Sequence, residues 1–183
     1  FWLLLVIMVS SGATELAVSQ WASTLAESGL GVSKTVGDLA GPCLFSVFMG
    51  LGRILGARFD DSARLRVMTG AGVLCVLSYL LIALAPIPAL SLAGCALCGF
   101  AVSVSWPMTL GLAAQAMPQG GMALFALLAF GGDIGCTTSP GLAGLVAGRC
   151  GDDLQMGILG AIVFPLLMLA AMLGVGRKMK KVK

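Results

Sequence analysis

Two acidic side chains lie deep inside apolar stretches of this sequence, and they are its clearest candidates for chemistry. Glu15 lies near the middle of the first stretch, and Asp133 lies about 20 Å beyond Gly120 at the rise of a helix. An ionised group at the centre of a bilayer costs about 2.5–3.5 kcal/mol on insertion scales, so both side chains are expected to face protein or water. Such acids exchange protons or hydrogen-bond polar solutes, so both are candidate binding residues.

The sequence around Glu15 is polar on one helical face. Ser11, Ser19 and Ser23 lie at four-residue steps from it, which places them on that face. Because an intramembrane acid is by default a functional candidate, this pattern favours a cavity lining over a buried neutral acid that bridges helices. No basic residue lies in the same stretch, and low dielectric without a nearby cation favours the protonated form of an acid. We therefore expect Glu15 to be protonated part of the time at working pH. If the protein uses a proton, either Glu15 or Asp133 would carry it, and Glu15 is the favoured residue.

The other candidate residues each have two interpretations. Asp133 lies in a glycine-rich stretch, so tight helix packing and a cavity are equally good explanations for it. Trp21 either stacks on a ligand or belongs to the aromatic belt at the membrane surface. Trp106 precedes a proline that frees a backbone carbonyl, so a kink there serves a gate or only the scaffold. The predicted solute- and ion-binding residues are Glu15, Ser19, Gln20, Trp21, Trp106 and Asp133.

The composition predicts the kind of element that holds these residues. Of 183 residues, 58% are hydrophobic and 10% are charged, and the mean hydropathy is +1.03. A soluble domain carries about 25% charged residues, so this is the composition of a polytopic membrane protein. The sequence has no histidine, no HExxH or GxSxG motif, and no basic patch interleaved with aromatics. We expect no enzyme, no cofactor or metal site, and no nucleic-acid partner.

Six apolar runs predict an all-α bundle of six transmembrane helices over residues 1–175. Each run is long enough to cross the hydrocarbon core of a bilayer. A basic segment, residues 176–183, follows the last run as a tail. The predicted helices cover about residues 1–26, 36–55, 67–85, 89–116, 122–148 and 154–175.

Basic residues are concentrated at one end of the predicted bundle. Residues 50–66, GLGRILGARFDDSARLR, hold four of the eleven basic residues between the second and third runs. With six helices, nine basic residues fall on the side of this segment, and only Lys34 and Arg149 fall opposite. Since Lys and Arg mark cytoplasmic loops, the segment and both ends of the chain are expected in the cytoplasm, around a cytoplasmic membrane. The basic tail either contacts anionic lipid or, as we favour, only anchors the topology.

Small residues predict close packing rather than chemistry. Cys95 and Cys98 form a CxxC inside an apolar helix, where packing is favoured over a redox or zinc site. The second run reads GDLAGP and the fifth reads GDIGCTTSP, a faint echo that would suit a three-plus-three inverted repeat. Glycines four residues apart, which let helices approach closely in lipid, occur at Gly37 and Gly41, Gly52 and Gly56, and Gly144 and Gly148.

The stretch MGLGRILGARF resembles the G-x-x-x-[D/R]-x-x-G-[R/K] loop of the major facilitator superfamily, in the form found in the C-terminal half. GATELAVSQW, SWPMTL and FGGDIGCTTSP look like segments of the sugar-permease-like (fucose-permease-like) branch of that superfamily. The acid typical of the loop in the N-terminal half is absent, and Arg53 stands in its place. The residues that match the gating loop are Gly52, Arg53, Gly56 and Arg58.

This resemblance implies half of a twelve-helix secondary transporter that works by alternating access. The sequence begins at Phe1, inside an apolar run and without a methionine, so a preceding six-helix half is the expected partner. The expected substrate is a small polar solute, with sugar the first candidate, and the expected coupling ion for symport is a proton. In that branch the first helix of the C-terminal half often carries an acid, which would match Glu15. The alternative is a six-helix membrane scaffold or assembly subunit without transport of its own.

Overall fold

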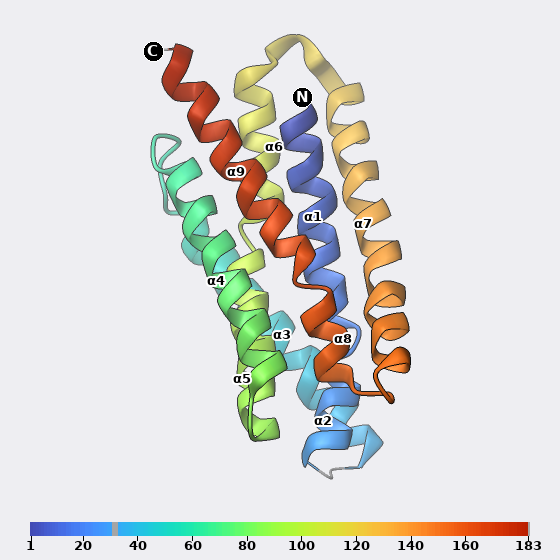
Figure 1. Cartoon of the computed structure of the whole chain (residues 1–183). Coiled ribbons are helices and arrows are strands. Elements are labelled where there is room, and N and C mark those ends of the chain that lie inside the picture. Colours follow the sequence, from blue (N-terminus) through green and yellow to red (C-terminus); the bar gives the residue numbers. More distant parts are fainter. Residues whose placement is uncertain (31–32, 183) are drawn as a thin grey trace.

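The computed structural model of the chain describes residues 1–30 and 33–182, with side chains described over 1–27 and 33–179 (Figure 1). All elements in these ranges are helical. In chain order they are α1 (Trp2–Ser19), α2 (Ala22–Leu30), α3 (Lys34–Gly56), α4 (Arg64–Leu84), α5 (Pro88–Val102), α6 (Ser105–Ala116), the short 3₁₀ helix η1 (Pro118–Gly120), α7 (Gly121–Arg149), α8 (Leu154–Gly160) and α9 (Val163–Val182). The N-terminus and the C-terminus lie at the same end of the bundle.

Six stretches of the described residues are long and apolar enough to cross a membrane. They are Trp2–Glu27, Lys34–Gly56, Arg64–Leu84, Pro88–Ala116, Pro118–Arg149 and Leu154–Met179. The predicted all-α fold with six spans is therefore confirmed, and it indicates a multi-pass membrane protein. The break predicted between the first two helices, residues 27–35, includes residues 31 and 32, which lie outside the described residues, as does Lys183 of the predicted tail.

Two of the six spans are interrupted where a proline removes a helical hydrogen bond. The fourth span breaks at Ser103 and Val104, between α5 and α6. Pro107 has no N–H to give to the Ser103 carbonyl, and its ring crowds that carbonyl. The sixth span breaks after α8, and Pro165 stands in the same relation to the Ala161 carbonyl. Continuous runs in the sequence therefore become pairs of helices.

The first span is interrupted without a proline. α1 ends at Ser19 and α2 begins at Ala22, so Gln20 and Trp21 form the turn between them. The Trp21 indole Nε1 donates a hydrogen bond to the Pro140 carbonyl of α7 at 3.1 Å. This turn is held by a neighbouring helix, which a local reading of the sequence cannot show.

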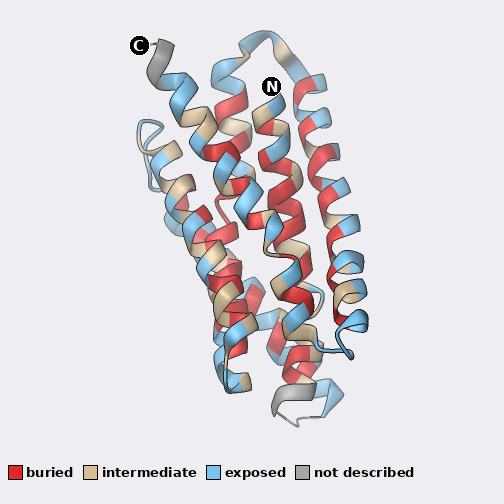
Figure 2. Cartoon of the chain, in the orientation of Figure 1, coloured by how far each residue is buried: buried red, intermediate tan, exposed pale blue. Residues whose placement is uncertain are grey.

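α1 is the central helix of the bundle. It packs against α7, α9 and α5, and Figure 2 shows buried residues along nearly its whole length. Its buried positions include the polar residues Ser10, Ser11 and Thr14. The fully buried Tyr79 of α4 donates its hydroxyl hydrogen to the Thr14 carbonyl at 2.9 Å. By contrast, α3 turns most of its large apolar side chains outward, as expected for a lipid-facing helix.

Glycine sets how closely the helices approach. A methyl group at Gly135 of α7 would overlap the main chain of Val9 and Ala13 in α1, so these two helices touch through their backbones. The predicted close packing is confirmed at five of the six positions named above: Gly37 and Gly41 lie against α2, Gly52 and Gly56 against the α5–α6 break, and Gly144 against Trp21. It is wrong for Gly148, which is exposed and where an added methyl group would make only an ordinary contact, 3.8 Å from Asp152 Oδ1.

Candidate functional site

Glu15 lies half-buried on α1. Burial has the larger effect on its carboxyl group, and the charge of Arg53, in the last turn of α3, has the smaller. Arg53 is therefore a neighbouring charge that the sequence did not predict. The reason is where α3 ends: Gly56 packs on Val104, and α6 continues for about 18 Å beyond that point. Arg53 thus lies level with the bundle interior rather than at its rim.

The fifth span brings a second acid toward the same region. Asp133 is exposed on α7, and the Thr137 hydroxyl donates to its main-chain carbonyl at 2.7 Å. Cys136, one turn further along α7, lies against α1, because a methyl group at Gly12 would overlap its Sγ. Its thiol therefore belongs to the contact between α1 and α7. Sequence reasoning missed Cys136, although its spacing of three from Asp133 places both on one side of a helix.

Several buried polar atoms near this region have no hydrogen-bond partner among the described residues. They include Ser11 Oγ, Ser105 Oγ and Trp106 Nε1. Ser11 lies one turn before Glu15 on the same face, and the Trp106 ring packs on Gly132 of α7. A buried polar group without a partner costs about 1–3 kcal/mol, so such groups are suited to hydrogen-bond water or a solute. The three atoms belong to α1 and α6.

The three candidates at the end of α1 have different surroundings. Ser19 is half-buried and Gln20 is exposed at the turn between α1 and α2. Trp21 is held by α7: its Nε1 donates to Pro140, and its ring lies against Gly144. Trp21 is therefore a packing residue between two spans in this conformation, with one face of its ring covered.

The predicted gating loop is seated on the break in the fourth span. Gly52 and Gly56 are buried, and a methyl group at Gly52 would overlap Ser103 and the Phe100 carbonyl. Arg58, just beyond the end of α3, is exposed. The end of α3 and the α5–α6 break are thus in direct contact, so a change at one is felt by the other.

A second contact fastens the loop to α6. Asp61 accepts a hydrogen bond from Arg64 and another from the Gln115 side chain, the latter at 2.5 Å. The Arg64 guanidinium also lies against Gly111 of α6. None of these residues was singled out from the sequence, because the partners Asp61 and Gln115 are 54 residues apart and only the fold brings them together.

At the opposite end of the bundle, an uncharged group of hydrogen bonds, which we call the Gln155 clasp, connects neighbouring helices. The Gln155 side-chain amide donates to the carbonyls of Ile82 and Ala85, both at 3.1 Å, and lies 3.2 Å from Ser91 Oγ. A hollow of about 350 Å³ lies beside it, with Asp153 and Pro86 among its lining residues. This clasp joins α8 to the turn between α4 and α5.

Within residues 1–30 and 33–182, no group of three or more Cys, Asp or Glu side chains is arranged to hold a metal ion. In comparisons with known proteins, no family model, no curated protein and no solved structure matches this chain.

Proposed function

We propose that this chain is half of a secondary active transporter of a small polar solute, with sugar as the first candidate. The observation that carries the proposal is that Glu15, Arg53 and Asp133 all lie within the spans. Ionisable groups at this depth are expensive and mark ion or substrate paths. They lie beside unpartnered hydroxyl and indole groups of the kind that bind a polar solute.

The pair Glu15 and Arg53 offers a way to couple a proton to movement. While Glu15 is ionised, it attracts Arg53 and with it the end of α3. A proton on Glu15 removes that attraction, so the position of α3 becomes linked to protonation. Because Gly52 and Gly56 seat α3 on the α5–α6 break, the change would pass to the fourth span. A ligand shifts such an equilibrium only by its differential affinity for the two states.

The proposal includes a second six-helix unit. α3 and α7 carry the paired sequences GDLAGP and GDIGCTTSP, and in both the aspartate is exposed while a glycine stripe packs inward. This parallel supports a three-plus-three inverted repeat of the major-facilitator kind. The exposed Asp133 would then face the partner half or an aqueous cavity, whereas Asp38 accepts a hydrogen bond from the Ser23 hydroxyl of α2.

We further propose a cytoplasmic membrane as the location, with the loop at residues 57–63 and the chain end after α9 in the cytoplasm. The support is the excess of Arg and Lys at this end. In a background without native cysteines, a cysteine introduced by Ser62→Cys should resist membrane-impermeant thiol reagents in intact cells. Rapid labelling from outside would reverse the orientation.

Transport itself is tested with the intact protein in proteoliposomes, using radiolabelled L-fucose and a panel of other monosaccharides. Arg53→Ala should slow counterflow while leaving binding of the transported sugar largely intact. The reason is that the Arg53 side chain would control the position of α3 and would not contact the solute. Arg149→Ala, at the exposed end of α7, is the matched control and should transport normally. If no solute in the panel moves with the unaltered protein, the transport proposal gives way to a membrane scaffold. Normal turnover of Arg53→Ala would reduce that arginine to a topology anchor.

A further inference from the structure

α3 and α4 are consecutive spans, yet they do not pack along each other. Both lie on α5, and their contact with one another is slight. Between them is a groove of about 360 Å³ beside the loop that joins them. Leu55, Phe59, Val67, Leu74 and Phe100 are among its walls. The groove is bounded by helices that cross the membrane, so it opens among lipid tails rather than into bulk water.

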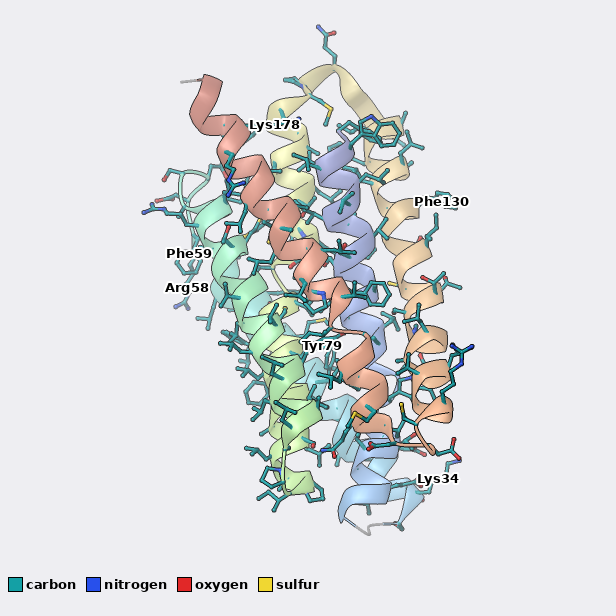
Figure 3. The ribbon with its side chains drawn as sticks, viewed as in Figure 1. Lys34, Arg58, Phe59, Tyr79, Phe130 and Lys178 are labelled. Atoms are coloured by element: carbon teal, nitrogen blue, oxygen red, sulfur yellow. The ribbon has the colours of Figure 1, made fainter. Side chains whose placement is uncertain are left out.

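The chemistry of the groove is that of a lipid tail with a charge at one end. Its walls are almost wholly apolar, and Arg58 at the loop end is the charged residue among them. Figure 3 shows Arg58 and Phe59 next to each other at the edge of the bundle, on the side where α3 and α4 meet the loop. Of the two acids in this described loop, Asp61 is engaged by Arg64 and Gln115, which leaves the exposed Asp60 as the competitor for Arg58.

The groove also has room for a ligand without movement of the backbone. Gly70 of α4 belongs to its wall, and a methyl group added there would meet nothing within 4 Å. A volume of about 360 Å³ is at the lower end of the ~300–1,000 Å³ of ligand pockets, enough for part of one acyl chain. An apolar hollow that stayed unfilled would lose dispersion contacts along its whole lining.

We propose that this groove is a binding site for an anionic glycerophospholipid, with one acyl chain between α3 and α4 and the phosphate on Arg58. The chain would fill the space between the two helices, and the arginine would fix the headgroup by charge-assisted hydrogen bonds. The lipid thereby becomes part of the packing at the loop end of α3. This inference rests on the groove and on Arg58, and it holds whether or not the protein is a transporter.

Native mass spectrometry of the purified protein tests the site. The protein is titrated with an equimolar mixture of phosphatidylglycerol and phosphatidylcholine that carry the same acyl chains. We expect the first retained lipid to be phosphatidylglycerol by about five-fold, the factor that one arginine near an anionic surface supplies. Arg58→Gln should bring the two lipids to equal occupancy. Arg177→Gln, an exposed arginine on α9, is the matched control and should keep the preference.

A second pair of variants tests the groove separately from the charge. Gly70→Leu should fill it and strongly reduce retention of the first lipid. Gly141→Leu places the same side chain at an equally open, exposed glycine on α7 and should leave retention unchanged. Equal retention of both lipids by the unaltered protein, or equal behaviour of the two leucine variants when both are folded, would overturn the site. If Gly70→Leu does not fold, the Arg58 pair still decides the result.

Discussion

Glycine lines both the α3–α4 groove and the contact between α1 and α7 around Gly135, which we call the α1–α7 seam. In the seam glycine allows close packing, and at Gly70 of the groove it leaves space open. In the seam, Gly135 allows the main chain of Val9 to approach until no methyl group would fit. In the groove, Gly70 faces open space, because both neighbouring helices rest on α5 instead of on each other. Glycine therefore permits close approach without causing it, and the partner helix decides which outcome occurs.

The two regions also differ in polarity. Glu15 of α1 and Cys136 and Asp133 of α7 are polar residues of the two helices that form the seam. The tight backbone packing at Gly135 holds these helices in place. The groove is apolar with a single arginine in its lining. We infer that the seam is the fixed part of the fold, whereas the groove depends on what the membrane supplies. A change in one region, with the same change in the other as its control, tests this contrast.

The largest effect is expected from Gly135→Leu in the seam. The new side chain would overlap main-chain atoms of Val9 and Ala13, so the two central helices would have to separate. Overpacking of this kind lowers the free energy of unfolding by about 3 kcal/mol or prevents folding. Denaturation in mixed detergent micelles measures it, with Gly70→Leu as the control near the unaltered value. Similar losses in both variants would remove the contrast between the regions.

A smaller effect is expected from Gly52→Ala, where α3 sits on the α5–α6 break. The added methyl group would meet the Ser103 side chain and the Phe100 carbonyl, which lowers the free energy of unfolding by about 2 kcal/mol. Gly50→Ala, two residues earlier in the same helix, has nothing within 4 Å of its new methyl group. It should instead stabilise by about 0.5–1 kcal/mol through helix propensity. The same denaturation assay compares the two variants. If Gly52→Ala were more stable than the unaltered protein, Gly52 would not be in close contact with the α5–α6 break.

The smallest effect is expected from Tyr79→Phe. It removes the hydroxyl donor to the Thr14 carbonyl and keeps the ring, so the free energy of unfolding should fall by about 1 kcal/mol. Ser62→Ala, in the exposed loop, is the control and should be silent. A Tyr79→Phe variant as stable as the unaltered protein would show that this bond does not tie α4 to α1.

The sequence was sufficient for the fold class and for features that depend on neighbours along the chain. Apolar runs predicted the six spans, and four-residue spacing predicted the seats of Gly41 and Gly52. Pro107 and Pro165 each account for one helix break by the same local rule, and a kink is predicted from the sequence only at Pro107. Such features need only local rules.

The candidate site was less accessible because it is made of distant partners. The charge of Arg53 acts on Glu15 because α3 ends beside the α5–α6 break, and residues 50–66 alone do not predict that position. In the same way, Trp21 was read as a ligand or interface residue, while its indole is bonded to Pro140 across the bundle. The two acids could be predicted because an ionised side chain in a membrane span is energetically costly. The residues near them could not be predicted, because only the fold brings them together.

The most direct test of the transport proposal is Glu15→Gln in the intact protein, reconstituted with an imposed proton gradient. Glutamine keeps the shape and hydrogen bonding of the side chain but cannot titrate or attract Arg53 as an anion does. Using whichever panel sugar the unaltered protein moves, we expect the variant to lose uphill accumulation and to retain exchange of the same sugar down its gradient. Glu27→Gln, outside the proposed site, should keep both. If Glu15→Gln accumulates and exchanges the sugar like the unaltered protein, Glu15 does not carry the proton and the coupling proposal fails.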